Sequence, residues 1–165
     1  MIDKDDLASK HIVNVHYAWH DAKNMYLVID LLSGGDFRYH LAKECSFQPE
    51  CTMFFMANIA IALDAAHKKN IIHRDLKPEN LVFGHDGYVN LTDFGISEIS
   101  DPDESNHNIV SGTPGYMAPE VMQNRQHDTK ADYFALGVIG YECMTSKRPY
   151  KGKIKNKIRD AILAE

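Results

Sequence analysis

Two polar motifs separated by a short stretch of apolar and turn residues constrain this chain most. The first is HRDLKPEN at residues 73–80, and the second, DFG, begins thirteen residues later at Asp93. Residues 81–83 and 88–91 have strand character, and the Gly-His-Asp-Gly turn at 84–87 predicts a hairpin between them. A hairpin returns the chain to its starting end, so Asn80 and Asp93 should lie close together. An amide oxygen and a carboxylate there can share Mg²⁺ ions, with Asp75 one loop upstream.

These motifs are too specific for an ordinary polar loop. With four fixed positions at about 5% each, a chain of this length would contain H-R-D-x-x-x-x-N by chance in roughly one case in a thousand. The DFG motif downstream lowers those odds further. One alternative stays open, in which the motifs are genuine and the protein is catalytically inactive.

The composition sets the broad class of the protein. At 165 residues, 44% hydrophobic and 25% charged, the chain is long enough for one compact unit. Its net charge of −5 and the absence of a Lys/Arg cluster predict no nucleic-acid partner. Three cysteines without a C-x-x-C pair indicate a reducing compartment. With no long apolar run and no signal-peptide pattern, we expect no membrane span and a cytoplasmic location.

The order of predicted elements is strands first and helices afterwards. Strands are expected at residues 12–19 and 24–30, and a flexible connector at 31–35 follows them. Helices are expected at 36–42, 49–69, 129–144 and 155–164, and a polar loop at 97–108.

Further motifs extend the pattern along almost the whole chain. Lys77 stands two residues after Asp75, SGTPGYMAPE occupies 111–120, and ADYFALGV occupies 131–138. GGDFRYHL at 34–41 and KRPY at 147–150 are narrower features. With these motifs the chain resembles the eukaryotic serine/threonine protein kinases, and the last two point to the AGC group.

The resemblance implies an α+β, two-lobed protein-kinase-like fold that is truncated. Residues 1–30 would be a remnant of the N-terminal lobe with two strands. Residues 31–165 would be a partial, mostly α-helical C-terminal lobe with the catalytic loop, DFG and activation segment. Neither G-x-G-x-x-G nor V-A-I-K appears upstream. We therefore expect these 165 residues alone to lack phosphotransfer and to expose apolar surface.

The resemblance also implies ATP and Mg²⁺ as cofactors and proteins as substrates. Asp75 would be the base that accepts the proton of the substrate hydroxyl, Lys77 would lie over the transferred phosphoryl group, and the metal ligands would be Asn80 and Asp93. Residues expected at the nucleotide are Asp30, Leu32, Asp36, Glu79, Asn80, Val82, Thr92 and Asp93. Residues expected to support the catalytic loop are His73, Arg74 and Asp132.

The activation segment would contain Ser105, Ser111, Thr113 and Glu120. Arg74 beside Asp75 is typical of kinases in which a phosphate paired with that arginine orders the segment. Relatives carry the phosphorylated threonine four residues before Thr113, where this chain has Ile109. Ser105 and Ser111 are the nearby hydroxyls that would substitute.

The same resemblance suggests a substrate preference and two competing functions. Asp36, Glu79 and Glu142 would line a groove that favours substrate arginines preceding the phosphorylated residue.

The first function that competes with an active protein kinase is a catalytically inactive fragment or pseudokinase that acts as a binding scaffold. The second, a small-molecule kinase, is disfavoured by the SGTPGYMAPE segment.

Overall fold

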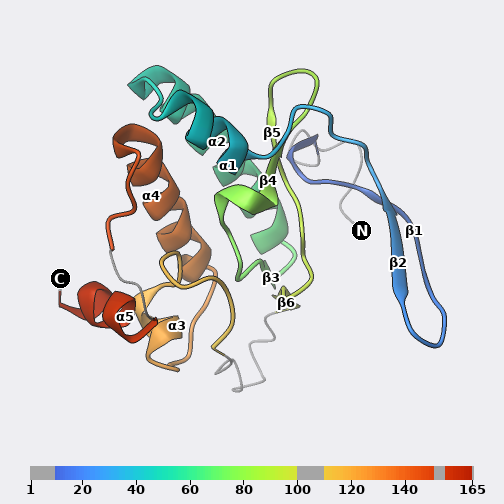
Figure 1. The fold of residues 1–165 in the computed structure, drawn as a ribbon. Coiled ribbons are helices and arrows are strands. Elements are labelled where there is room, and N and C mark those ends of the chain that lie inside the picture. Colours follow the sequence, from blue (N-terminus) through green and yellow to red (C-terminus); the bar gives the residue numbers. More distant parts are fainter. Residues whose placement is uncertain (1–9, 100–109, 151–154, 165) are drawn as a thin grey trace.

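The computed structural model describes residues 10–99, 110–150 and 155–164. As predicted, two strands come first, and the rest of the chain is mainly helical with short strands in its middle (Figure 1). They are β1 (Val15–His20), β2 (Met25–Ile29), α1 (Phe37–Glu44), α2 (Pro49–His67), β3 (Ile71–Ile72), the 3₁₀ turn η2 (Pro78–Asn80), β4 (Leu81–Phe83), β5 (Val89–Leu91), β6 (Glu98–Ile99), α3 (Pro119–Met122), α4 (Lys130–Thr145) and α5 (Lys155–Leu163).

The antiparallel hairpin β1–β2 extends away from the helical body (Figure 1). Every residue of both strands is exposed, including Trp19, whose ring stacks on Tyr26 at 5.3 Å. The chain before β1 lies along β5, where the Val13 N–H donates to the Leu91 carbonyl at 3.0 Å. The hairpin therefore contributes little to the buried core of the described residues.

The connector after β2 lies beside β4. The Gly34 N–H donates to the Phe83 carbonyl, and the Phe83 N–H donates to the Gly35 carbonyl, both at 2.9 Å. A β-carbon at Gly34 would stand 2.6 Å from the Phe83 carbonyl oxygen, so this close approach requires glycine. Asp36 then caps α1 by accepting the Tyr39 N–H at 2.8 Å.

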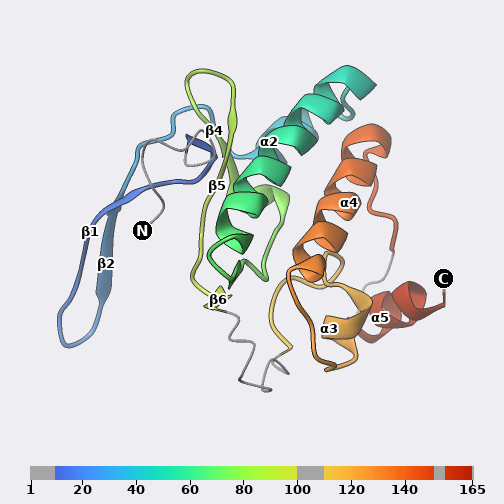
Figure 2. The same ribbon diagram turned by 180° about the vertical axis from the view of Figure 1, so that it is seen from behind.

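The main core lies between α2, α4 and the β4–β5 hairpin, and Figure 2 shows the two long helices side by side. Pro49 starts α2 at the first helical turn, where its missing N–H removes no hydrogen bond. Ile59, Leu63 and Ile139 are fully buried in this core, together with Phe37 from α1. Each such side chain stabilises the fold by about 1.5–3 kcal/mol through burial. A second cluster joins α3 to α5 through Val121, Met122, Ile158 and Ile162, among others.

The predicted α+β class, with two early strands and a mainly helical remainder, is confirmed. Element ends differ by a few residues: the first strand begins at Val15, and α1 continues to Glu44. The pattern missed β3, β6 and α3, because elements of two to four residues carry no readable periodicity. β6 falls inside the predicted loop 97–108, whose residues from 100 onward lie outside the described ranges.

Apolar side chains are exposed on α4, through Tyr133, Tyr141 and Met144, and also around the β1–β2 hairpin. Leu31 is 92% exposed, and the hairpin adds Tyr17, Met25 and Leu27. None of the helices formed by the described residues is both long and apolar enough to cross a lipid bilayer.

Candidate active site

The β4–β5 hairpin forms as predicted and brings its two flanking motifs together. Leu81 pairs with Leu91, and beyond this pair the Thr92 N–H donates to the Asn80 carbonyl at 2.9 Å. At the closed end the Gly84 N–H donates to the Tyr88 carbonyl at 2.9 Å. The HRDLKPEN and DFG motifs therefore meet at the open end of one hairpin.

A buried carboxylate from α4 fixes the loop that precedes η2. Asp132, whose exposed fraction is 1%, accepts the backbone N–H groups of His73 and Arg74, each at 2.9 Å. The Nε2 atom of His67 lies 2.8 Å from the same carboxylate. Arg74 has a φ of 66°, a conformation that non-glycine residues rarely adopt, and these hydrogen bonds hold it there.

The imidazole of His73 connects this loop to the strand that leads into DFG. The ring is fully buried, and its Nε2 atom lies 2.9 Å from the Thr92 carbonyl. The Asp75 N–H donates to Nδ1 at 3.3 Å, so Nε2 carries the proton that bonds the carbonyl. The ring also meets Phe94 edge to face at 4.9 Å. One side chain therefore sets the position of Asp75 relative to the DFG motif.

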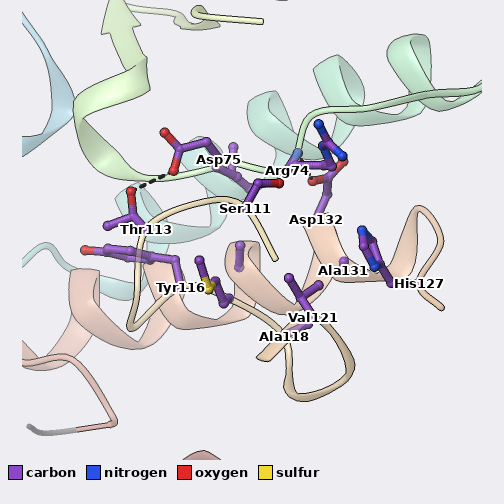
Figure 3. Close-up of a pocket in the computed structure, with 13 residues that line it drawn as sticks. Arg74, Asp75, Ser111, Thr113, Tyr116, Ala118, Val121, His127, Ala131 and Asp132 are labelled. Atoms are coloured by element: carbon purple, nitrogen blue, oxygen red, sulfur yellow. Dashed lines mark hydrogen bonds between the residues drawn. The ribbon is translucent and has the colours of Figure 1, made fainter. Parts of the chain in front are cut away.

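Asp75 is the centre of a polar cluster drawn from two parts of the chain. Its Oδ2 atom accepts from Lys77 Nζ at 2.6 Å and from Asn80 Nδ2 at 3.3 Å. Its Oδ1 atom accepts from the Thr113 hydroxyl at 2.7 Å, and Figure 3 shows these two side chains facing each other. Lys77 Nζ also lies 3.2 Å from the Thr113 hydroxyl. The carboxylate is thus oriented on all sides by named donors.

Asn80 and Asp93 offer oxygen atoms at the open end of the hairpin. The Asn80 amide nitrogen donates to the Asp75 carbonyl at 3.0 Å, which assigns its oxygen to the opposite side. Asp93 is exposed with a φ of 61°, and its Oδ1 atom accepts the Gly95 N–H at 3.2 Å. Amide and carboxylate oxygens are the ligands that Mg²⁺ prefers, so this pair fits that ion.

The comparison with known families agrees with this arrangement. The family model described as "Protein kinase domain" matches residues 4–165. The chain belongs to the protein kinase family. Protein kinases generally use ATP and Mg²⁺.

Several curated kinases are similar to this chain. Ribosomal protein S6 kinase alpha-6 from Danio rerio is 41% identical over 152 residues, which is 92% of this chain and 20% of that protein. Ribosomal protein S6 kinase 2 alpha from Xenopus laevis is 38% identical over 165 residues, 98% of this chain and 22% of the relative. A probable serine/threonine-protein kinase from Dictyostelium discoideum is 38% identical over 154 residues, which is 93% of this chain and 34% of that protein.

These relatives confirm the resemblance to serine/threonine protein kinases of the AGC type. The chain spans about a fifth of the length of the S6 kinases and about a third of the Dictyostelium protein.

The kinase residues expected at the nucleotide lie along one edge, between the β1–β2 hairpin and β4. Asp36 forms a β-bridge with Val82, next to the open end where Thr92 bonds Asn80. Asp30 directly follows β2, and its carboxylate accepts from Asn14 Nδ2 at 2.7 Å. Burial raises the pKa of Asp30, but the hydrogen bonds from Asn14 and the contact with His16 outweigh it and lower the pKa overall. Leu32 lies half-buried in the connector that follows.

A small, partly open cavity lined in part by Asp75 is separate from that edge (Figure 3). Its volume is about 20 Å³, which is the size of one water molecule. Ser111 and His127 line it, and the Ser111 hydroxyl and His127 Nε2 are buried without a hydrogen-bond partner in the part of the chain that the structure describes. The cavity is far too small for a nucleotide, so it is a feature of the activation segment's packing.

The structure pairs Arg74 with a carboxylate of this chain. The Arg74 guanidinium bonds the Glu98 carboxylate, and its Nε atom donates to the Ile96 carbonyl at 2.7 Å. A negative group from β6 thus occupies part of the environment in which the resemblance expects a phosphate. Ser105 lies outside the described residues. Glu120 lies in the first turn of α3, where its carbonyl accepts the Arg125 N–H at 2.9 Å.

Sequence reasoning missed a second polar cluster, centred on Arg38 of α1. Its guanidinium bonds Glu79, Glu142 and the Tyr116 hydroxyl. Burial lowers the pKa of Arg38, but the hydrogen bonds to Glu142 and Glu79 outweigh it and raise the pKa overall. Burial also raises the pKa of Tyr116, and Glu142 adds to this shift. An arginine two residues after Asp36, one member of the predicted acidic groove, was the signal that could have identified the cluster.

Proposed function

We propose that this chain carries the catalytic face of a serine/threonine protein kinase, which transfers the γ-phosphoryl group of ATP to Ser or Thr hydroxyls of proteins. The observation that supports this most is the environment of Asp75. Its carboxylate is positioned by Lys77, Asn80 and Thr113, while its loop is held from below by Asp132. The serine/threonine kinase names of the relatives point the same way.

In this proposal each residue of the site has a separate role in phosphoryl transfer. Asp75 orients the substrate hydroxyl and accepts its proton, because a positioned carboxylate is a competent general base. Lys77, 2.6 Å from that carboxylate, supplies a positive charge beside the transferred group. Asn80 and Asp93 would hold Mg²⁺, which neutralises phosphate charge when bound.

The nucleotide would lie along the edge between the β1–β2 hairpin and β4. Asp30 and Leu32 would offer backbone groups to adenine, Asp36 would meet the ribose, and Val82 would contact the base. The Asp36–Val82 bridge keeps these last two residues adjacent. Glu79 directly precedes Asn80 in η2, and the Thr92 hydroxyl donates to the Asn80 carbonyl at 3.1 Å. A cytoplasmic location, and a lack of phosphotransfer by these 165 residues alone, stay predictions.

The test uses the full-length protein that carries this chain, with steady-state phosphorylation of a protein substrate. Asp75→Asn should lower kcat by about 10²–10⁴-fold with little change in ATP affinity, because the base acts on the hydroxyl. Asp93→Asn should instead raise the Mg²⁺ concentration needed for half-maximal rate. Asp86→Asn, at the closed end of the same hairpin, is the matched control and should change neither quantity.

Two results would contradict the proposal. Turnover near the wild-type rate in Asp75→Asn would exclude this carboxylate as the base. Nucleotide binding without any phosphotransfer by the wild-type protein would favour the scaffold function instead.

The predicted preference for substrate arginine depends on Asp36, Glu79 and Glu142. These carboxylates would have to be free to receive a substrate guanidinium. In the structure Asp36 accepts the Tyr39 N–H, and Glu79 and Glu142 both bond Arg38.

A further inference from the structure

Arg38 links α1 to three other parts of the kinase fold. Its Nε atom donates to Glu79 Oε1 in η2 at 2.9 Å, and its Nη1 atom donates to Glu142 Oε1 in α4 at 2.8 Å. Its Nη2 atom bonds the Tyr116 hydroxyl and lies 3.4 Å from Glu142 Oε2. The Tyr116 hydroxyl in turn donates to Glu142 Oε2 at 2.6 Å. One guanidinium therefore engages two carboxylates through three nitrogens.

The bonding of Glu142 leaves no place for a second guanidinium. Its side chain is only 9% exposed, and both of its oxygens accept hydrogen bonds. A buried carboxylate needs a charged partner, and Arg38 supplies one from within the chain in the fork geometry that arginine favours. Glu79 differs, because its side chain is 47% exposed and Arg38 engages one of its oxygens. A substrate arginine would have to displace Arg38 to reach Glu142.

This cluster adjoins the site of phosphoryl transfer. Glu79 directly precedes Asn80, whose amide bonds Asp75. Tyr116 follows Thr113 by three residues, and Thr113 bonds the other oxygen of Asp75. A peptide whose hydroxyl reaches Asp75 therefore passes close to the surface that Arg38 occupies.

We propose that Arg38 is a specificity-determining residue that takes the place of a substrate arginine at Glu79 and Glu142. This rests on the proposed protein kinase function. Because Glu142 is fully bonded and Glu79 shares the same guanidinium, the enzyme does not select peptides strongly by arginine at the positions that reach these carboxylates. The proposal replaces the arginine preference expected from the acidic residues alone, since charge complementarity requires unpaired acids.

A purely structural role for Arg38 makes a different prediction. If the cluster only fastens α1 to α4, removing the guanidinium weakens the fold and leaves peptide selection unchanged. If Arg38 excludes substrate arginine, its removal creates a new selectivity. The experiment must therefore measure selection and not only stability.

The test is a positional peptide library with the full-length protein, in which arginine or its neutral isostere citrulline occupies each position before the phosphorylated serine. The wild type should favour arginine over citrulline by less than about threefold at every position. Arg38→Met should gain a preference of about tenfold or more at one or two positions, because Glu142 becomes available to a bidentate partner. Arg148→Met is the matched control, because Arg148 stands 5.9 Å from the ring of Tyr116. It should produce no gain.

Two measurements keep the result decisive. If no peptide is phosphorylated, the proposed kinase function fails. The inference about Arg38 can still be tested, because fluorescence anisotropy compares the binding of arginine and citrulline peptides to the wild type and to Arg38→Met. If Arg38→Met does not fold, Glu79→Gln in the wild-type background replaces it and should shift arginine selection by less than about threefold. A tenfold preference for arginine in the wild type, no gain in a folded Arg38→Met protein, or a tenfold loss in Glu79→Gln would each overturn the proposal.

Discussion

The catalytic loop and the β1–β2 hairpin both adjoin the same β4–β5 hairpin, yet they are held in opposite ways. In the catalytic loop a single buried carboxylate, Asp132, bonds two successive backbone N–H groups, and the buried ring of His73 bonds a third segment. In the β1–β2 hairpin every strand residue is exposed. Its attachment to the body is through backbone bonds such as Val13 to Leu91.

The difference shows where the stability of this kinase chain resides. Buried hydrogen bonds to a charged group are strong and costly to break, whereas exposed strands gain little from burial. The residues proposed for proton transfer belong to the first region, and the adenine contacts proposed for Asp30 and Leu32 border the second. We therefore expect the catalytic loop to keep its geometry even when the hairpin opens.

The largest effect is expected from removing the anchor of the catalytic loop. Asp132→Ala leaves the buried N–H groups of His73 and Arg74 without an acceptor, so the free energy of unfolding should fall by about 3–5 kcal/mol. Urea denaturation followed by circular dichroism measures this. Asp64→Ala removes an exposed carboxylate that pairs with Lys68 and should cost about 0.5 kcal/mol or less. Equal losses in the two variants would contradict the anchoring role.

A smaller contrast is expected between two leucines, one in each region. Leu63→Ala in α2 deletes a fully buried side chain and should cost about 2–5 kcal/mol. Leu27→Ala in β2, where the side chain is 58% exposed, should cost about 0.5 kcal/mol. The same denaturation experiment compares them. A cost for Leu27 as large as that for Leu63 would mean that the hairpin is packed against other residues in solution.

The smallest effect concerns pH and the base of the hairpin. The pKa of Asp30 is lowered in the folded state, so its contribution to stability is present above the usual aspartate pKa and is lost as pH falls through the folded pKa. Amide exchange in β1 and β2 should therefore quicken, relative to Asp30→Asn, as pH falls below the usual aspartate pKa of about 3.9. The Asp30→Asn protein should lack this component. Identical pH profiles of amide exchange in the wild type and in Asp30→Asn would show that Asp30 does not stabilise the hairpin.

The sequence predicted much of the fold because its long elements carry clear signals. The nineteen residues of α2 begin at a proline, and the Gly-His-Asp-Gly turn identifies the β4–β5 hairpin. The hairpin in turn brings Asn80 near the DFG motif, which follows from local pairing alone. Short elements such as α3, with four residues, gave no such signal.

The missed features of the site are long-range side-chain pairings. Arg38 and Glu142 are 104 positions apart in sequence, and Arg74 and Glu98 are 24 apart. Charge alone does not specify which acidic residue an arginine will meet. The acidic groove was therefore predicted as open, although an arginine of the same chain bonds two of its members.

Native-state hydrogen exchange tests the contrast between the two regions most directly. The amides of His73, Arg74 and Thr92 should exchange only through global unfolding, because each bonds an acceptor that is at least partly buried. The amides of β1 and β2 should exchange through local opening, at least about a hundredfold faster after correction for intrinsic rates. Protection of the hairpin equal to that of the catalytic loop, or rapid exchange at His73 and Arg74, would contradict the account.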